Sequence, residues 1–147
     1  MKLSHKEIYA LEAMMTLAGK HSQRPTKIGH IAVLEQIPQK FLELILLDLR
    51  HARLVESSRG VNGGYRLRRA PAEISLGDIL RTIGGSLAPA GNPQFLRRLL
   101  GRDERHRALH QVLVDAHNAS AAILDRTSLA DLPLPVAACD EESAQGR

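Results

Sequence analysis

The stretch from Arg59 to Leu67, RGVNGGYRL, places an arginine beside residues that tolerate tight backbone turns. Three of its nine residues are glycine and one is asparagine. Glycine lets the backbone approach a neighbouring surface closely, so the guanidinium of Arg59 could enter a narrow, electronegative minor groove of duplex DNA. Gly60, Asn62 and Gly63 would shape the turn that carries it. Asn62-Gly63 predicts a hairpin turn, because both residues tolerate positive φ.

Polar side chains also lie at the start of the apolar segment 37–54, which reads IPQKFLELILLDLRHARL. Pro38 suits the first turn of a helix, where its missing N–H costs no hydrogen bond. Gln39, Lys40 and Glu43 would then fall outside the buried face of that helix. Glutamine pairs with adenine, lysine with guanine, and glutamate accepts from the amino group of cytosine. These three residues are therefore candidates for reading the major groove.

Four further residues are candidate phosphate contacts, which fix the register of a protein on DNA without reading its sequence: Lys6, Tyr9, Lys27 and Arg50. Residues 1–70 carry 12 Lys and Arg against 6 Asp and Glu, a net charge of +6, whereas residues 71–147 carry 8 against 10, a net charge of −2. The two values sum to the +4 of the whole chain. A basic front half is typical of a polyanion-binding surface, although an ordinary solvated surface would also account for the charge alone.

Three histidines, His106, His110 and His117, are spaced by four and seven residues near the end of the chain. On a helix they would share one stripe, and two histidines at positions i and i+4 can bind a transition metal. Facing stripes of two subunits could build a metal or haem site. The simpler interpretation is a polar edge of a subunit interface.

The one cysteine of the chain, Cys139, rules out an intramolecular disulfide. A free, inert thiol is the favoured interpretation, with an intermolecular disulfide or a redox-sensing thiol as alternatives. The sequence has no Ser/His/Asp or Cys/His arrangement, no paired-carboxylate motif and no P-loop, so it indicates no enzyme class. No apolar run reaches the length of a membrane span, and charges interrupt the N-terminal segment. We therefore expect a cytoplasmic protein.

The elements that must position these residues follow from hydrophobic spacing and turn residues. Two short helices followed by a hairpin form a winged helix-turn-helix. The expected fold class is mainly α with a small β-hairpin, ending in a long dimerisation helix. In chain order we expect a helix from Ser4 to about Ala18, helices in 27–36 and 38–54, strands in 54–60 and 65–69, a helix from Ser75 to Gly84, and a long helix over about 105–126.

The predicted domain organisation has four parts: a winged helix-turn-helix DNA-binding domain over 1–84, a linker or loop over 85–104 with at most a short turn of helix, a dimerisation helix region over 105–132, and a flexible tail over 133–147. The long helix is apolar on one side and needs a partner surface, which a second copy of the chain would supply. The predicted dimer interface comprises Leu109, Val112, Leu113, Ala116, Ser120 and Ile123.

Three segments together resemble the Rrf-two family of bacterial transcription regulators. They are MKLSHKEIYALEAMMTLA at 1–18, IPQKFLELILLDLRHARLVESSRGVNGGYRL at 37–67 and ISLGDILRTIGG at 74–85. The resemblance is close over about 1–85 and continues loosely to TSLADL at 127–132. Its most specific feature is the wing pattern RG..GGY.L, preceded by L..LR...LV.

This resemblance implies a homodimer of winged helices crossed through the long C-terminal helices and bound to a roughly palindromic operator. By matching positions it implies a groove-reading role for Gln39, Lys40 and Glu43, and a minor-groove role for Arg59. Val61 replaces a proline that is common in the wing of the family, which should loosen the tip.

Many members of the family hold an iron–sulfur cluster through three cysteines in the stretch that matches 85–105, and here that stretch has none. Thiolates are the ligands of such clusters, so we expect no cofactor. The predicted function is a sequence-specific regulator, most simply a repressor. Its signal would be a small-molecule effector, a protein partner or its own abundance. Two alternatives stay open: a protein–protein adaptor that uses the winged helix without DNA, and a metal- or haem-responsive regulator that senses through the three histidines.

Overall fold

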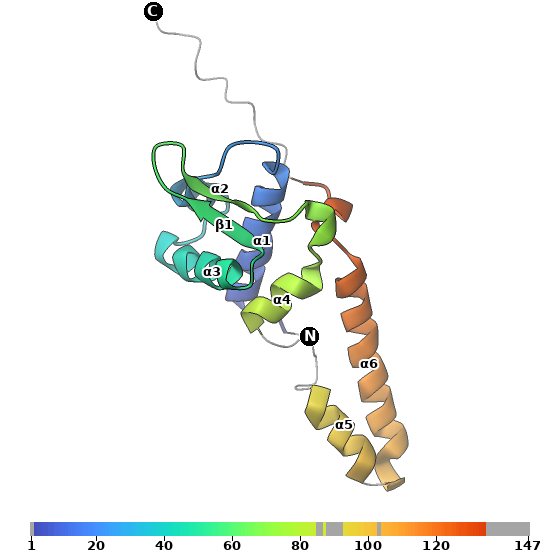
Figure 1. Cartoon of the computed structure of the whole chain (residues 1–147). Coiled ribbons are helices and arrows are strands. Elements are labelled where there is room, and N and C mark those ends of the chain that lie inside the picture. The colour runs from blue at the N-terminus through green and yellow to red at the C-terminus, as the bar shows by residue number, and fades with distance from the viewer. Residues whose placement is uncertain (1, 85–86, 88–92, 103, 135–147) are drawn as a thin grey trace, which may run out of the picture.

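The computed structural model describes residues 2–84, 87, 93–102 and 104–134. They form a winged-helix body from which a helical arm projects (Figure 1). The predicted class, mainly α with one β-hairpin and a long C-terminal helix, is confirmed. Cys139 and the predicted tail beyond residue 134 lie outside the described residues.

Helix α1 (His5–Gly19) begins at Ser4, as predicted. The Ser4 hydroxyl accepts a hydrogen bond from the Glu7 amide at 3.3 Å, and the Glu7 carboxylate accepts one from the Ser4 amide at 2.7 Å. This reciprocal capping box satisfies amides that have no partner within the helix. The inner face of α1 is built from small and flexible apolar side chains, including the fully buried Ala10, Ala13 and Met14.

Helices α2 (Ile28–Leu34) and α3 (Gln39–His51) form the helix-turn-helix. The turn between them depends on Gln36, which adopts a φ of 53°, in the left-handed region that glycine usually fills after a helix. Ile37 then turns inward and is buried, and its amide donates to the carbonyl of Ala32 at 3.0 Å. This left-handed residue ends α2 two residues before the end of the predicted segment 27–36.

Strands β1 (Val55–Ser58) and β2 (Gly64–Leu67) pair in antiparallel register, from Val55 opposite Leu67 to Ser58 opposite Gly64. The wing loop therefore comprises the five residues 59–63.

The predicted turn with positive φ at Asn62 and Gly63 is wrong. Positive φ values occur instead at Gly60, 101°, and Gly64, 147°. The Gly63 amide donates to the Gly60 carbonyl at 3.0 Å, so Val61 and Asn62 occupy the centre of the turn. Because the strands stop pairing at Ser58 and Gly64, a two-residue turn has no place in this hairpin.

The core of the body lies where α1, α3, the wing strands and α4 (Leu76–Gly84) meet. Helix α3 contributes Leu42, Ile45, Leu46 and Leu49, all fully buried, from one face. Helix α4 begins with a second capping box, in which the Asp78 amide donates to the Ser75 hydroxyl at 3.0 Å. The short 3-10 turn η1 (Pro71–Glu73) joins β2 to α4.

The arm consists of α5 (Pro93–Arg102) and the long helix α6 (Arg107–Arg126), joined by the 3-10 turn η2 (Glu104–His106). Helix α5 folds back along α6 at the end far from the body (Figure 1). The stretch 85–104, expected as a linker, thus contains a ten-residue helix. Its apolar residues Phe95, Leu96, Leu99 and Leu100 recur at helical spacing, but they span less than two turns, which is a short signal for a helix.

The arm returns to the body through its C-terminal end. Arg81 of α4 donates two hydrogen bonds to the Asp125 carboxylate of α6, each 2.7 Å long. The 3-10 turn η3 (Leu129–Asp131) buries Leu129 in the core, and the Leu129 amide donates to the Ile74 carbonyl at 3.0 Å. Within the described residues, no helix is both long enough and apolar enough to cross a membrane.

Candidate nucleic-acid interface

The first turn of α3 carries the three residues predicted to read the major groove. Gln39, Lys40 and Glu43 are all exposed there, because the buried face of α3 starts with Leu42. Lys40 forms no ion pair with any described residue. The structure thus presents one amide, one ammonium and one carboxylate on a helix end that is free to enter a groove.

The wing tip carries the second set. Arg59, Gly60 and Asn62 are exposed, whereas Gly63 is buried against the hairpin. A Cβ atom at Gly63 would overlap the backbone carbonyl of Ser58, so a side chain at this position would open the loop. The wing loop and α3 lie on the side of the body away from α6 (Figure 1). The structure therefore brings the two predicted DNA-reading elements to one side of the molecule.

Two of the predicted phosphate contacts make intramolecular contacts between α1 and α3. Lys6 donates to the Asp48 carboxylate at 2.8 Å, and both side chains are partly buried. Tyr9 packs edge-to-face on Phe41, with ring centroids 5.8 Å apart. Both residues therefore hold the recognition helix in place, a role that sequence spacing alone did not reveal.

The other two predicted phosphate contacts are exposed cations. Lys27 precedes the first residue of α2, and Arg50 lies in the last turn of α3. Arg50 donates to the Ser57 hydroxyl of β1 at 3.3 Å, so it also connects the recognition helix to the wing.

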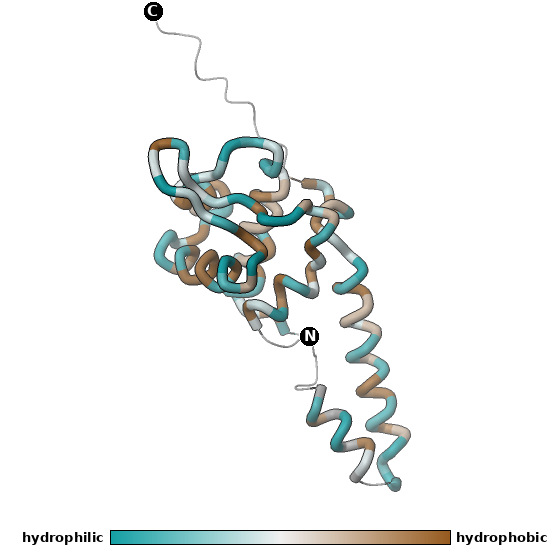
Figure 2. The backbone as a smooth tube through the Cα atoms, viewed as in Figure 1, coloured by the Kyte–Doolittle hydropathy of each residue, from teal (hydrophilic) through white to brown (hydrophobic). Residues whose placement is uncertain are grey.

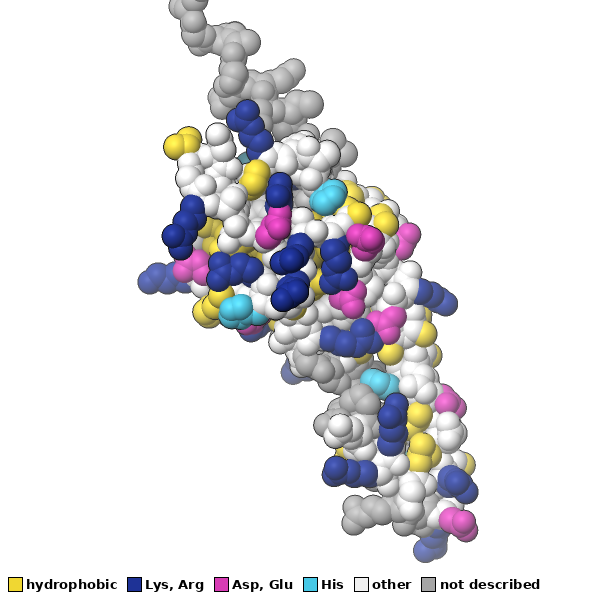
Figure 3. Space-filling model, viewed as in Figure 1, with side chains coloured by type: hydrophobic (Ala, Val, Ile, Leu, Met, Phe, Trp, Pro, Cys, Tyr) yellow, Lys and Arg dark blue, Asp and Glu magenta, His cyan; other side chains and the backbone are white. Residues whose placement is uncertain are grey.

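Further cations that the sequence did not single out lie on the same body. Lys and Arg side chains are spread over the face drawn in Figure 3. The RLRR run at 66–69, which begins in β2, supplies three exposed arginines, and one of these, Arg66, is paired with Glu56 on the opposite strand. The signal was present in the charge count of residues 1–70. Exposed cations of residues 2–70 outside the groups already named are Lys2, Arg24 and Arg53.

The predicted dimer residues divide between two faces of α6. Leu109, Val112 and Ile123 are 56%, 64% and 52% exposed, and Ala116 is also exposed. Leu113 and Ser120 are half-buried beside that stripe, on a helix that α5 and α4 also contact. Apolar residues recur along the whole length of α6 (Figure 2). The exposed ones, together with Ala119, follow alternate spacings of three and four residues, as in the seam between two packed helices.

The three histidines differ in their surroundings within a single chain. His106 is exposed in η2, whereas His110 and His117 are half-buried on α6, each with a buried Nδ1 atom that has no hydrogen-bond partner among the described residues. The rings of His106 and His110 lie 6.2 Å apart. Within the part of the chain that the structure describes, no three His, Cys, Asp or Glu side chains are close enough to hold a metal ion.

Comparison with known proteins identifies the family. A family model described as Rrf2, iron-dependent transcriptional regulator, matches residues 3–133. The chain belongs to the Rrf2 family of transcriptional regulators. Rrf2 proteins are regulators that bind DNA, not enzymes, and this agrees with the exposed recognition helix and wing.

Individual Rrf2 relatives extend the match over most of the chain. The transcriptional regulator CymR of Bacillus subtilis is 35% identical over 132 residues, which cover 90% of this chain and 89% of CymR. The solved structure of that protein, titled the global cysteine regulator, superposes with a TM-score of 0.77 at 34% identity and covers 89% of this chain and 95% of the other. The structure of T. potens IscR gives a TM-score of 0.71 at 31% identity, covering 89% and 85%.

The iron in the description of the Rrf2 model does not fit the side chains present here. Iron–sulfur clusters are held by several cysteine thiolates, and this chain has one cysteine in all. In place of thiolates, the half-buried face of α6 offers the imidazoles of His110 and His117. The donor set for a thiolate-ligated cluster is therefore absent from the sequence.

Proposed function

We propose that this protein is a homodimeric repressor that binds a pseudo-palindromic operator in the cytoplasm and does so without an iron–sulfur cluster. The observation that carries the proposal is the polarity of the molecule. The start of α3 and the wing tip face one side, and the exposed apolar stripe of α6 lies on the arm, away from them.

In the proposed complex the first turn of α3 enters the major groove. Gln39 and Lys40 donate to base edges, and Glu43 accepts from an exposed amino group. The wing reaches the adjacent minor groove, where Arg59 meets the most negative potential of the duplex. Lys27 and Arg50 bind backbone phosphates, whose contacts set the register. Lys6 and Tyr9 support this geometry from behind, through Asp48 and Phe41.

The α6 stripe supports the dimer. Leu109, Val112, Ala116 and Ile123 expose apolar surface on a helix that has no fully buried residue of its own. Burying such a stripe against its copy removes apolar area from water, which stabilises the pair by about 25 cal/mol for each Å². A two-fold dimer presents two identical reading heads, so its operator has two related half-sites.

Selection of genomic DNA fragments with the purified protein tests this proposal. We expect enrichment of an inverted repeat whose half-sites are separated by about one helical turn or a multiple of it. Recovery of no sequence above background, together with no measurable affinity for duplex DNA, would instead favour the protein–protein adaptor. Fragments selected in this way also allow a screen for the small molecule or protein partner that releases the operator.

A separate measurement tests the proposed absence of a cluster. Protein purified without oxygen should be colourless, free of acid-labile sulfide and able to bind the selected operator. A brown preparation that contains iron and sulfide, and that loses operator binding when the iron is removed, would overturn this part of the proposal.

A further inference from the structure

A basic surface pocket of about 430 Å³ lies between the C-terminal end of α1, the loop that follows it, and α2. Lys20, Arg24 and Lys27 supply three cations to its lining, and His30 adds an imidazole. No carboxylate is among the seven residues that line it. Charges of one sign gathered in a concave surface concentrate the field, so this pocket attracts anions more strongly than the surrounding surface.

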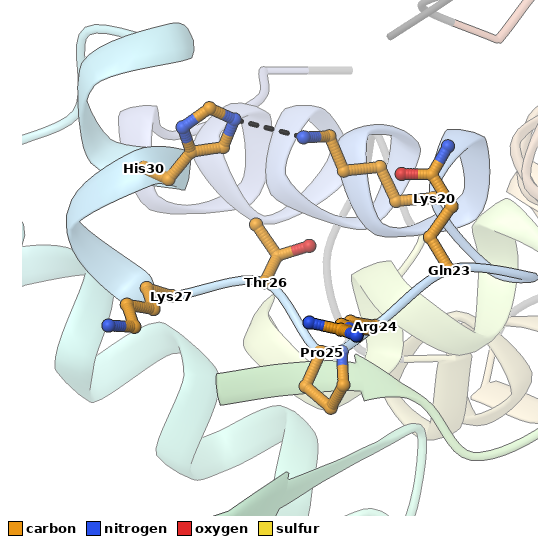
Figure 4. A pocket seen from close by; sticks show the side chains of 7 residues that line it. All are labelled: Lys20, Gln23, Arg24, Pro25, Thr26, Lys27 and His30. Carbon is orange, nitrogen blue, oxygen red and sulfur yellow. Dashed lines mark hydrogen bonds between the residues drawn. The ribbon is translucent and has the colours of Figure 1, made fainter. Parts of the chain in front are cut away.

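The polar groups around the pocket can make further hydrogen bonds to an anion. Lys20 Nζ lies 2.9 Å from His30 Nε2, and the two side chains face each other in Figure 4. An ammonium so placed keeps donors free for an incoming oxygen atom. Thr26 is only 6% exposed and lines the pocket, yet its hydroxyl makes no hydrogen bond to any described residue. A hydroxyl that makes no such bond can donate to, or accept from, a ligand in the pocket.

The same segment is attached to the wing. The Thr26 amide donates to the Tyr65 carbonyl, and the Tyr65 amide donates to the Thr26 carbonyl, both at 2.8 Å. Gly64 comes so close to this segment that a Cβ atom there would lie 2.5 Å from the Thr26 carbonyl oxygen. A ligand that orders residues 24–27 therefore also acts on strand β2, which carries the wing loop.

We propose that this pocket binds an oxyanion, a phosphate or carboxylate group, through Lys20, Arg24 and the Thr26 hydroxyl, and that its occupation is coupled to the position of the wing. The oxyanion can come from two sources, a free small molecule or a backbone phosphate of DNA. The second source depends on the DNA binding proposed above, whereas the first does not.

Titration of the full-length protein with inorganic phosphate, followed by calorimetry and by amide NMR, tests the first source. We expect saturable binding, with shifts at the Thr26 and Tyr65 amides. The double variant Lys20→Gln with Arg24→Gln should bind phosphate at least about tenfold more weakly, because two charge-assisted hydrogen bonds are lost. Thr26→Val, which keeps the shape of the side chain, should weaken binding several-fold. Arg98→Gln, an exposed cation on α5, is the control and should change nothing.

The same variants bound to the selected operator fragment test the second source. If phosphate does not bind but the double variant loses operator affinity with a shallower salt dependence than Arg98→Gln, the pocket holds a DNA phosphate. If phosphate binds and Arg59→Ala leaves that binding intact, the pocket is a free-anion site that stands whether or not the wing reads DNA. If the double variant matches Arg98→Gln in both measurements, the proposal is wrong.

Discussion

The winged-helix body and the arm differ in how far they bury their apolar side chains within a single chain. The body buries a continuous core, in which Met14, Ile31, Leu46 and Ile79 are completely inaccessible to solvent. Helix α6 has no fully buried residue, and three of its large apolar residues, Leu109, Val112 and Ile123, are more than half exposed. The body therefore has a core of its own within a single chain, whereas the apolar stripe of α6 is left uncovered there, which agrees with the proposed dimer.

This contrast predicts that shortening a leucine to alanine affects stability differently in the two regions. Leu46→Ala removes a fully buried side chain, so we expect the free energy of unfolding to fall by about 3 kcal/mol at any protein concentration. Leu109→Ala removes a side chain that the single chain leaves exposed, so any loss should depend on protein concentration. Chemical denaturation at two protein concentrations distinguishes them. Equal, concentration-independent losses would contradict the contrast.

Charge placed on the α6 stripe should separate the subunits without unfolding the body. Val112→Glu with Ala116→Glu buries two carboxylates in the proposed interface, so we expect a monomer by light scattering. Operator affinity should fall by about a hundredfold, because each half-site then binds alone. Asn118→Glu puts the same charge on an exposed position outside the stripe and is the matched control. A double variant that stays dimeric would show that the interface lies elsewhere.

Gly64 lies where the wing meets the α1–α2 loop, and we expect it to be the glycine of the body that least tolerates a side chain. Gly64 has a φ of 147° and no room for a Cβ atom beside Thr26. We expect Gly64→Ala to destabilise the body by about 2 kcal/mol, since it adds a clash to backbone strain. Gly60 has a φ of 101° with open space around it, so Gly60→Ala should cost only about 1 kcal/mol. Thermal unfolding of both variants tests this order. An equal loss of stability would show that the close approach of Gly64 to Thr26 does not matter.

The smallest expected effect on stability is at the Arg81–Asp125 ion pair, which joins the body to the arm. Hydrogen bonds from Arg81 hold the pKa of Asp125 below its ordinary value of 3.8. A lowered carboxyl pKa stabilises the folded state above the unfolded pKa, and this contribution disappears as the pH falls through the folded value. We expect Asp125→Asn to cost about 0.5 kcal/mol at pH 7, because the pair is largely exposed. The two proteins should become equally stable at a pH well below 3.8, and a constant difference would exclude this linkage.

Local signals in the sequence predicted most of the body. The capping serines Ser4 and Ser75 identified where α1 and α4 begin, because capping depends only on residues a few positions apart. The turn inside the wing was not predictable in this way. Its centre at Val61 and Asn62 is set by which strand residues pair, and pairing is a tertiary property.

The arm was less predictable for a related reason. Helical spacing identified α6 but not how exposed each position on it is, so the half-buried Leu113 and Ser120 were grouped with the exposed stripe. Nothing in the sequence indicated that Lys6 pairs with Asp48, which lies 42 residues away. Composition and spacing do not reveal the roles of residues that make contacts between elements far apart in the sequence.

Binding of the selected operator by the parent protein and by Arg59→Ala, measured over a range of salt concentrations, tests the central claim most directly. Arg59 is exposed at the wing tip and forms no ion pair with any described residue, so its loss leaves the fold intact. We expect Arg59→Ala to bind about tenfold or more weakly with a shallower salt dependence, while Arg98→Ala on α5 matches the parent. Equal affinity and equal salt dependence for the parent and Arg59→Ala would contradict the account of a wing that grips DNA.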